Sequence, residues 1–170
     1  MSNSDVRVRR AEPADFAEVA AMHYPVWRRS WEGIVSPHLL DLLGPAQRWA
    51  DVVYPEMLSR RGWSMWIAEA GVATLGMVLF GPDSAHPEHV QIDSLYVDER
   101  HQRHGVGALL LRQAVCANPA ADVILWCAEI NTKGRRFYEK NDFRADGRTL
   151  DWEPLPWVRV PHLGYRLKRA

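Results

Sequence analysis

A short glycine-containing segment beyond the middle of the chain, RHQRHGVGAL, has residue types and spacing that suit phosphate binding. Gln102, Gly105 and Gly107 lie between an expected strand and an expected helix. The first turn of a helix carries unpaired backbone N–H groups and the positive end of the helix dipole, which together bind phosphate. Glycine lets the backbone approach a ligand and permits positive φ angles. The segment therefore predicts a phosphate-binding helix start with basic side chains at its rim.

Glycine pairs also occur in three further kinds of local structure, which differ in the residues they require. A tight strand-to-helix turn with solvated basic residues would use the same glycines without a ligand. A dinucleotide-binding fingerprint requires a further glycine three residues after Gly107, where Leu110 stands. A Walker-type loop ends in Gly-Lys-Ser/Thr, which the segment lacks. The sequence argues against the last two, and the glycines alone leave the plain turn open.

Hydrophobic periodicity predicts the elements that must position this segment. We expect strands at residues 6–10, 63–70, 74–80, 90–97, 122–128, 145–150 and 160–167. We expect a helix from residue 13 that ends or kinks at Pro25, and further helices at residues 37–43, 45–59, 106–117 and 131–141. The stretch at 45–59 contains Pro55, at which we allow for a division of the helix. The order predicts one α/β (α+β) domain over residues 1–170, with a mixed sheet flanked by helices.

Composition limits the classes of function. The 170 residues suffice for one domain with a real core, and 21 basic side chains balance 21 acidic ones. A general nucleic-acid binder normally needs a basic surface, so we expect none. The N-terminal MSNSDVRVRR lacks the apolar core of a signal peptide, and no long apolar run appears. Because Cys116 and Cys127 are outside metal or redox spacing, we expect a reduced cytoplasmic protein that does not bind membranes.

Two segments together resemble the signatures of the GNAT superfamily of N-acetyltransferases. LYVDERHQRHGVGALLL resembles its acyl-CoA-binding segment, a strand and then Gln/Arg-x-x-Gly-x-Gly/Ala at a helix start. LWCAEINTKGRRFYEKNDF resembles its second signature, with matches at Asn131, Phe137, Tyr138, Glu139 and Phe143. With the N-terminal VWRRSWEGIVSPHLLDLL, the resemblance spans nearly the whole chain. Asp142 stands where the family usually has glycine, but aspartate tolerates the left-handed conformation that ends a helix.

The resemblance implies an acyl-CoA N-acyltransferase fold, with a mostly antiparallel sheet, and acetyl-CoA as cofactor. The residues it assigns to the cofactor are Leu95, Tyr96, Val97, Gln102, Arg103, His104, Gly105, Val106, Gly107, Ala108, Asn131 and Phe137. Residues 95–97 would offer backbone groups to the pantetheine arm, as an added strand would. Asn131 has an alternative role as the cap of the helix that follows it.

The implied reaction needs a base and, to a smaller extent, an acid. An alkyl amine, with a pKa of about 10.4, must lose a proton before it attacks, and a thiol leaving group has a pKa of about 8.5. Tyr138, which the resemblance places near the CoA sulfur, is the candidate acid, and a core tyrosine is the alternative reading. Asp93, in the strand before the glycine segment, is the leading candidate base. Glu129, Glu32 and a water chain stay open as alternatives.

Aromatic and acidic side chains are the candidates for binding the acceptor amine: Trp27, Trp31, Glu32, Glu129 and Trp152. Aromatic rings can line an amine pocket or hold a cation, and core or dimer packing explains them equally well. We expect no metal, because His86, His89, His101 and His104 form no His-Glu-x-x-His helix and have no cysteine partner.

The sequence predicts an N-acetyltransferase that transfers the acetyl group of acetyl-CoA to a primary amine of a small molecule or peptide, by direct attack in a ternary complex. The alternatives are a protein N-terminal acetyltransferase, a non-catalytic acyl-CoA-binding module and an unrelated phosphate-binding α/β domain. The acceptor stays open because substrate loops vary within one fold. The aromatic content makes a homodimer a hypothesis.

Overall fold

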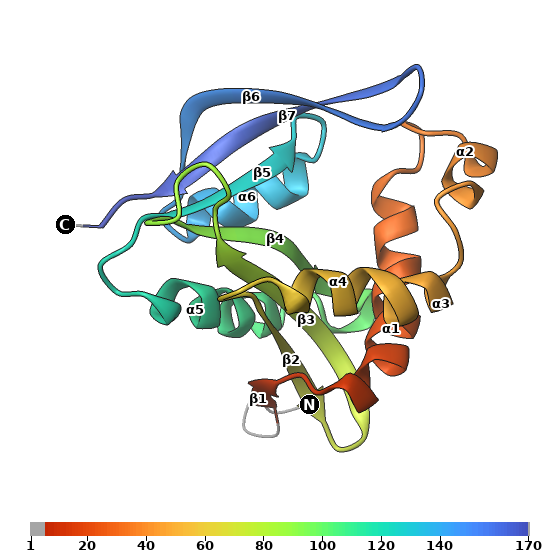
Figure 1. Cartoon of the computed structure of the whole chain (residues 1–170), viewed down its shortest axis with the longest axis horizontal. Helices are drawn as coiled ribbons and strands as arrows, with labels where there is room; N and C mark the ends of the chain where they lie inside the picture. The colour runs from red at the N-terminus through yellow and green to blue at the C-terminus, as the bar shows by residue number, and fades with distance from the viewer. Residues whose placement is uncertain (1–5, 170) are drawn as a thin grey trace.

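A seven-stranded sheet organises the computed structural model, which describes residues 6–169 (Figure 1). The strands are β1 (Arg7–Arg10), β2 (Ser64–Ala70), β3 (Ala73–Pro82), β4 (Val90–Val97), β5 (Val123–Ala128), β6 (Arg144–Leu155) and β7 (Val158–Leu167). Their order in the sheet is β1-β2-β3-β4-β5-β7-β6, and every neighbouring pair is antiparallel except β4 and β5. This confirms the predicted mixed sheet. Residues 1–5, which carry half of the segment that argued against a signal peptide, lie outside the described part.

Helices cover both faces of the sheet. They are α1 (Phe16–Ser30), α2 (Pro37–Asp41), α3 (Ala46–Arg48), α4 (Tyr54–Ser59), α5 (Val106–Ala117) and α6 (Thr132–Lys140). Side chains alternate along each strand, so Ile67 and Met77 pack under α1 while Ala68 and Val78 pack under α5 on the opposite face. The α5 face also receives Phe137 and Tyr138 of α6.

Pro25 and Pro55 each lie in a stretch of chain that stays helical. The first helix does not end at Pro25 but continues to Ser30. An interior proline costs about 3 kcal/mol, whereas Trp27 and Trp31, 5 % and 7 % exposed, contribute roughly 1.5–3 kcal/mol each by burial. The burial of these two side chains outweighs the proline. Near Pro55 the chain stays helical, because a π-helical turn at Trp49–Val53 precedes α4 and relaxes the backbone there.

The sheet opens between β4 and β5. These two strands pair only at Val90–Val123, Gln91–Ile124 and Ile92–Leu125. A β-bulge follows at Asp93, because Ile92 pairs with Phe80 of β3 and Ser94 pairs with the adjacent Leu79. Beyond the bulge, residues 94–97 still pair with β3 and residues 126–128 with β7, but not with each other. We call the opening between residues 94–97 and 126–128 the fork.

Candidate active site

The predicted phosphate-binding segment lies immediately after β4 and leads into α5. Arg103 and Gly105 both adopt left-handed backbone, with φ of 66° and 86°, and Gly105 is the N-cap of α5. Left-handed residues within such a turn direct successive N–H groups to one side and form a concave anion site. The free N–H groups of the first turn of α5 adjoin it. The residues present therefore fit a phosphate group.

Side chains from two distant elements hold this segment in place. The Gln102 carboxamide donates a hydrogen bond to the Val97 carbonyl at 2.9 Å and accepts one from the Lys133 ammonium group of α6. On the other side, Arg29 of α1 donates to the Glu99 carboxylate in the short 3-10 turn ahead of Gln102. Sequence reasoning missed Lys133, Arg29 and Glu99, because these contacts join residues 31 and 70 positions apart.

Asn131 caps α6, as one of its two predicted roles required. Its side-chain oxygen accepts a hydrogen bond of 2.8 Å from the backbone N–H of Gly134. Glycine at 134 leaves room for the capping side chain, because a Cβ atom there would lie 2.8 Å from Nδ2 of Asn131 and clash with it. At the other end, Asp142 takes the predicted left-handed conformation, with φ of 68°. Both ends of α6 are thus fixed locally.

Tyr138, the candidate acid, lies half-buried in an aromatic cluster. Its ring centroid is 5.3 Å from Phe137, 5.8 Å from Phe143 and 6.3 Å from Tyr165. Burial raises the pKa of the Tyr138 hydroxyl above its usual value, and neighbouring Cys127 raises it further. The phenol therefore keeps its proton at neutral pH and has one to give.

Cys127 is a neighbour of Tyr138 that sequence reasoning did not connect with the site. Its side chain is 5 % exposed and its Sγ lies 4.0 Å from the Asn131 carbonyl oxygen. Burial raises the pKa of the Cys127 thiol to about 11, an effect that nearby Arg135 opposes and Glu139 reinforces. At neutral pH the thiol is protonated, and the nucleophilic thiolate is scarce.

Asp93, the candidate base, is the extra residue of the β4 bulge and stands where the fork begins. The residue as a whole is exposed, and its carboxylate accepts a hydrogen bond of 2.6 Å from the Ser94 hydroxyl. Desolvation by the surrounding protein raises the pKa of the Asp93 carboxyl above its usual value, although Ser94 and the positive charge of Arg60 act in the opposite direction. This raised pKa is closer to the pKa of an efficient general base near neutral pH.

The Leu95, Tyr96 and Val97 backbone lines the β4 side of the fork, and the Tyr96 ring reaches the α1 face of the sheet. The centroid of this ring is 4.3 Å from that of His23, which is 1 % exposed. His23 shares a hydrogen bond of 2.8 Å with the Tyr54 hydroxyl. Burial lowers the pKa of His23 to about 3, so the imidazole is neutral. A neutral, buried histidine thus packs against the fork on the α1 face of the sheet.

Two of the predicted tryptophans form an aromatic cluster with a histidine on the α1 side of the fork. The Trp31 and Trp152 rings stack with centroids 4.7 Å apart, and His162 lies 6.1 Å from each. The same hydrophobic cluster includes Trp27, Ala128 at the end of β5 and, at its edge, Tyr96. The structure therefore brings Trp31 and Trp152 together beside the fork, while Trp27 is buried beneath.

The two glutamates predicted as alternatives lie at different places. Glu129 directly follows β5 at the fork, where it is exposed and its backbone N–H donates to the Pro161 carbonyl at 2.8 Å. Glu32 is exposed in the turn after α1 and lines a small pocket of about 130 Å³ with Val35 and Leu40. Glu129 is thus the one that adjoins the fork.

Of the four histidines considered for metal binding, His86 and His89 lie apart from the fork. His86 and His89, with Glu88, occupy the loop before β4, at the opposite end of that strand, and their ligand atoms lie within 4.8 Å of one another. Two of these three side chains are exposed. His101 and His104 belong to the glycine segment.

Within residues 6–169, no helix has the length and apolar character needed to cross a bilayer.

Comparison with known proteins points to one family. The family described as acetyltransferase (GNAT) domain matches residues 61–145. A relative from Mycobacterium tuberculosis, named as a probable N-acetyltransferase, is 58 % identical over 170 residues, covering 100 % of this chain and 98 % of that protein. The PaiA N-acetyltransferase of Thermoplasma acidophilum, solved in complex with coenzyme A, superposes with a TM-score of 0.72 at 16 % identity, covering 93 % of this chain and 97 % of that one. An N-acetyltransferase of Staphylococcus aureus gives 0.72 at 18 % identity, covering 95 % and 97 %. These two structures establish the fold.

Proposed function

The chain belongs to the GNAT family of acetyltransferases, and from this premise we propose that it transfers the acetyl group of acetyl-CoA to a primary amine of a small molecule or peptide. One observation carries the proposal: a left-handed, glycine-bearing helix start adjoins a fork in the sheet that exposes the backbone edge of β4. The phosphate site suits a pyrophosphate, and the unpaired strand edge next to it suits an arm that carries amide groups, so the two together suit a ligand that has both.

Three groups of residues would hold the cofactor. The first turn of α5, with the backbone of residues 103–108, would bind the pyrophosphate through N–H groups. The backbone edge of residues 95–97 would pair with the pantetheine arm. Asn131 and Phe137, from the start and middle of α6, would border the arm on the β5 side. His104 and Arg103 would add donors at the rim of the phosphate site.

The reaction requires two proton transfers, and the chain supplies a residue for each. Acetyl-CoA, when bound, supplies an acetyl thioester whose thiolate is the leaving group. Asp93 accepts the proton that the acceptor amine must lose before it attacks. Tyr138 donates its phenolic proton to the departing sulfur. Because Cys127 stays protonated, direct attack in a ternary complex fits better than an acyl-cysteine route.

The acceptor would enter from the α1 side, where the Trp31–Trp152 stack borders the fork. An ammonium group is attracted to the faces of such rings, and Glu129 adds negative charge at the end of β5. We include Trp27, Trp31 and Glu32 in this proposal as supports of the entry region rather than as direct contacts, because Trp27 and Trp31 are only 5 % and 7 % exposed and Glu32 lies in the turn after α1. The accessible ring of the stack is that of half-buried Trp152. A cytoplasmic location and a homodimer are further parts of the proposal, and light scattering of the purified protein tests the dimer.

Calorimetric titration with acetyl-CoA is the first test, with dephospho-CoA and ATP as controls. We expect saturable binding of acetyl-CoA, binding of dephospho-CoA as well because it retains the pyrophosphate and the pantetheine arm, and weaker binding of ATP, which lacks that arm. An amine panel followed by thiol release then tests turnover. Binding without amine-dependent release would instead support a non-catalytic acyl-CoA-binding module. Folded protein that fails to bind acetyl-CoA would overturn the proposal and leave the glycines as a turn.

A further inference from the structure

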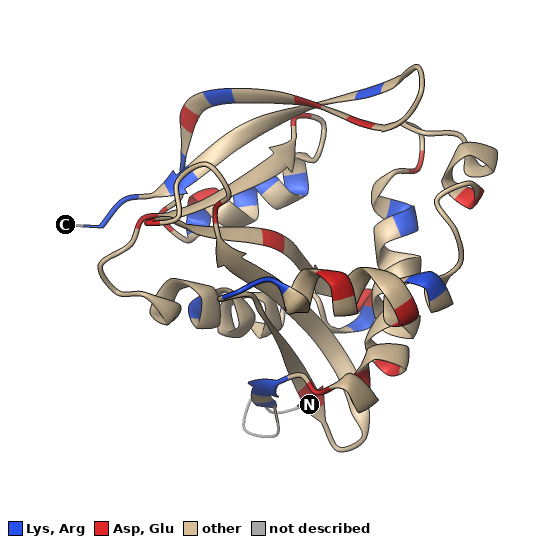
Figure 2. Ribbon diagram, viewed as in Figure 1, with Lys and Arg blue, Asp and Glu red and all other residues tan. Residues whose placement is uncertain are grey.

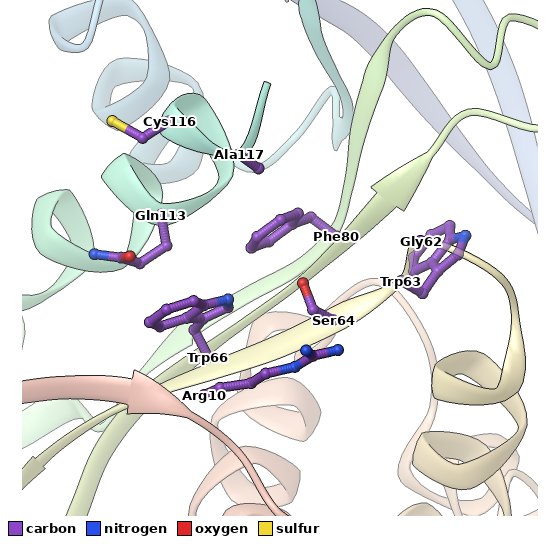
Figure 3. Close-up of a pocket in the computed structure, with 9 residues that line it drawn as sticks. All are labelled: Arg10, Gly62, Trp63, Ser64, Trp66, Phe80, Gln113, Cys116 and Ala117. Atoms are coloured by element: carbon purple, nitrogen blue, oxygen red, sulfur yellow. The ribbon is translucent and has the colours of Figure 1, made fainter. Parts of the chain in front are cut away.

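A pocket of about 450 Å³ lies on the α5 face of the sheet, at the opposite end of α5 from the glycine segment (Figure 3). We propose that it binds a planar aromatic carboxylate, independently of acetyl transfer at the fork. The residues that carry the argument are Arg10, Ser64, Trp66, Phe80 and Gln113. Figure 3 shows the Trp66 and Phe80 rings between α5 on one side and Arg10 and Ser64 on the other.

The chain just before β2 closes one end of the pocket. Gly62 lines it and has φ of 84°, and a Cβ atom there would lie 2.9 Å from Pro82. The Trp63 ring packs against Gly81 in the hydrophobic cluster on the α1 face, so it lies on the other side of the sheet from the Trp66 and Phe80 rings.

The pocket suits a flat aromatic molecule. Its rings are those of Trp66 and Phe80, which both belong to the α5 face, and its volume lies within the range of about 300–1,000 Å³ that is typical of small-molecule sites. Phe80 is 4 % exposed, whereas Trp66 is half-buried and keeps part of its ring accessible. Offset or edge-to-face contact between aromatic rings contributes about 0.5–1.5 kcal/mol per pair beyond burial.

The polar groups of the pocket favour an anion. On β1, Arg9 pairs with Asp15 and Glu69, and Arg7 lies 4.0 Å from Glu69. Arg10, the next residue, is exposed at the pocket, and within residues 6–169 no carboxylate forms an ion pair with it. The lining contains no acidic side chain. A guanidinium fork matches a carboxylate in shape and charge, with the Ser64 hydroxyl and the Gln113 amide as further donors.

Occupation of this pocket is compatible with a bound acyl-CoA. α5 has 12 residues and is therefore about 18 Å long. Gly105 and Gly107 are at its N-terminal end, whereas Gln113 and Cys116 belong to its C-terminal half. The two ligands would thus lie at opposite ends of one helix and bind together.

The test uses 2-naphthoate as the probe and 2-naphthamide as its uncharged counterpart, in calorimetric titrations with and without saturating acetyl-CoA. We expect 2-naphthoate to bind the wild type with the same affinity in both conditions. We expect 2-naphthamide, and 2-naphthoate with Arg10→Met, to bind at least about tenfold more weakly, because the charge-assisted hydrogen bond is lost. Arg112→Met, an exposed position on α5 outside the pocket, is the matched control and should bind like the wild type. No binding, competition by acetyl-CoA, or an unchanged affinity of Arg10→Met would each overturn the proposal.

Cys116 provides a second readout that needs no binding heat. Its thiol is exposed and lines the pocket, whereas Cys127 is 5 % exposed on the far part of the same face. Monobromobimane should therefore label Cys116 first, and Cys116→Ser should remove this labelling. Saturating 2-naphthoate should slow the labelling of Cys116 in the wild type but not in Arg10→Met. A labelling rate that 2-naphthoate leaves unchanged in the wild type would contradict occupation of the pocket.

Discussion

Gly107 of α5 lies directly against the ring of Phe137 of α6, so that a Cβ atom at position 107 would come within 3.3 Å of the Cε2 and Cζ atoms of that ring. This contact lets the start of α5 approach α6 closely beside the fork. Gly105, two residues earlier, meets a different requirement, because its φ of 86° is left-handed. The two glycines of the segment are therefore not interchangeable: one shapes the turn, and the other permits close packing of two helices.

We predict that Gly105→Ala lowers both the free energy of unfolding and the affinity for acetyl-CoA. Alanine in the left-handed region costs about 1–2 kcal/mol, and the turn that presents the N–H groups relaxes to reduce this strain. Gly71→Ala is the matched control, because Gly71 has φ of 60° in the β2–β3 turn and open space around its Cβ position. It should lose similar stability in urea unfolding but keep its affinity. Equal affinity losses in both variants would contradict a special role for Gly105.

Tyr138→Phe should lower kcat by roughly 10²–10⁴-fold, the usual range for loss of a general acid or base, and leave the acetyl-CoA Kd unchanged. Steady-state thiol release and calorimetry measure the two quantities. Tyr165→Phe is the control from the same aromatic cluster, since its hydroxyl donates to Glu139 at 2.9 Å and accepts from Arg135 at 3.0 Å. That variant should lose stability and keep most of its kcat. A fully active Tyr138→Phe would exclude the hydroxyl from the reaction.

The raised pKa of Asp93 predicts opposite effects on stability and activity. The folded protein binds the Asp93 proton more tightly than the unfolded chain does, so ionisation of this group lowers stability as pH rises from the ordinary carboxyl pKa through the raised one. Asp93→Asn removes this cost and should raise the melting temperature at pH 7. The same change should lower kcat/KM and remove the acid limb of its pH profile. An acid limb that persists in Asp93→Asn would assign the base to another group.

His23 predicts a loss of stability in mild acid. Its pKa is lowered to about 3 by burial, so between about pH 6.5 and 3 the unfolded chain binds a proton that the folded protein does not. Stability present above pH 6.5 is therefore lost at about 1.4 kcal/mol per pH unit below it. Urea unfolding at pH 7 and pH 5 should show a smaller difference for His23→Gln than for the wild type. An equal difference in His23→Gln and in the wild type would exclude His23 as the source of the acid sensitivity.

Trp152→Ala should raise the KM for the acceptor amine more than it changes the acetyl-CoA Kd, because Trp152 stacks on Trp31 beside the fork. Trp157→Ala is the control from the same hairpin, since Trp157 is 100 % exposed in the turn between β6 and β7. Amine saturation curves at fixed acetyl-CoA measure the effect. Identical KM values for the two variants would remove the aromatic stack from acceptor binding.

The elements next to the site were predictable because their signals are local. β4 and α5 were predicted at their observed bounds: alternation marks the strand, a glycine begins the helix, and Asn118-Pro119 ends it. The bulge at Asp93 was not predictable, because no glycine or proline marks it and it arises from the pairing of β4 with β3. The contact of Lys133 with Gln102 and the proximity of Cys127 to Tyr138 likewise depend on long-range packing.

Charge patterning along the chain likewise does not show which charged side chains are available to a ligand. Figure 2, a ribbon coloured by residue type, shows basic and acidic residues interspersed along most elements, in line with a net charge of zero. Alternation along the predicted strand puts Arg9 and Arg10 on opposite faces, but the sequence does not show their partners: the fold pairs Arg9 with two carboxylates and leaves Arg10 beside a pocket. Which cation is available to a ligand is decided by partners that are distant in sequence.

Within residues 6–169, the three residue pairs between β4 and β5 are the only strand pairing between the β1–β4 half of the sheet and the β5–β7 half. The sheet is thus two cooperative blocks with a narrow seam, and local opening should begin there at a lower free energy than global unfolding. A ligand that contacts both edges of the seam should stabilise the contact between the two halves of the sheet. We expect acetyl-CoA to slow amide hydrogen exchange on β4 and β5 together, and to leave the outer β1–β2 and β6–β7 pairs almost unaffected.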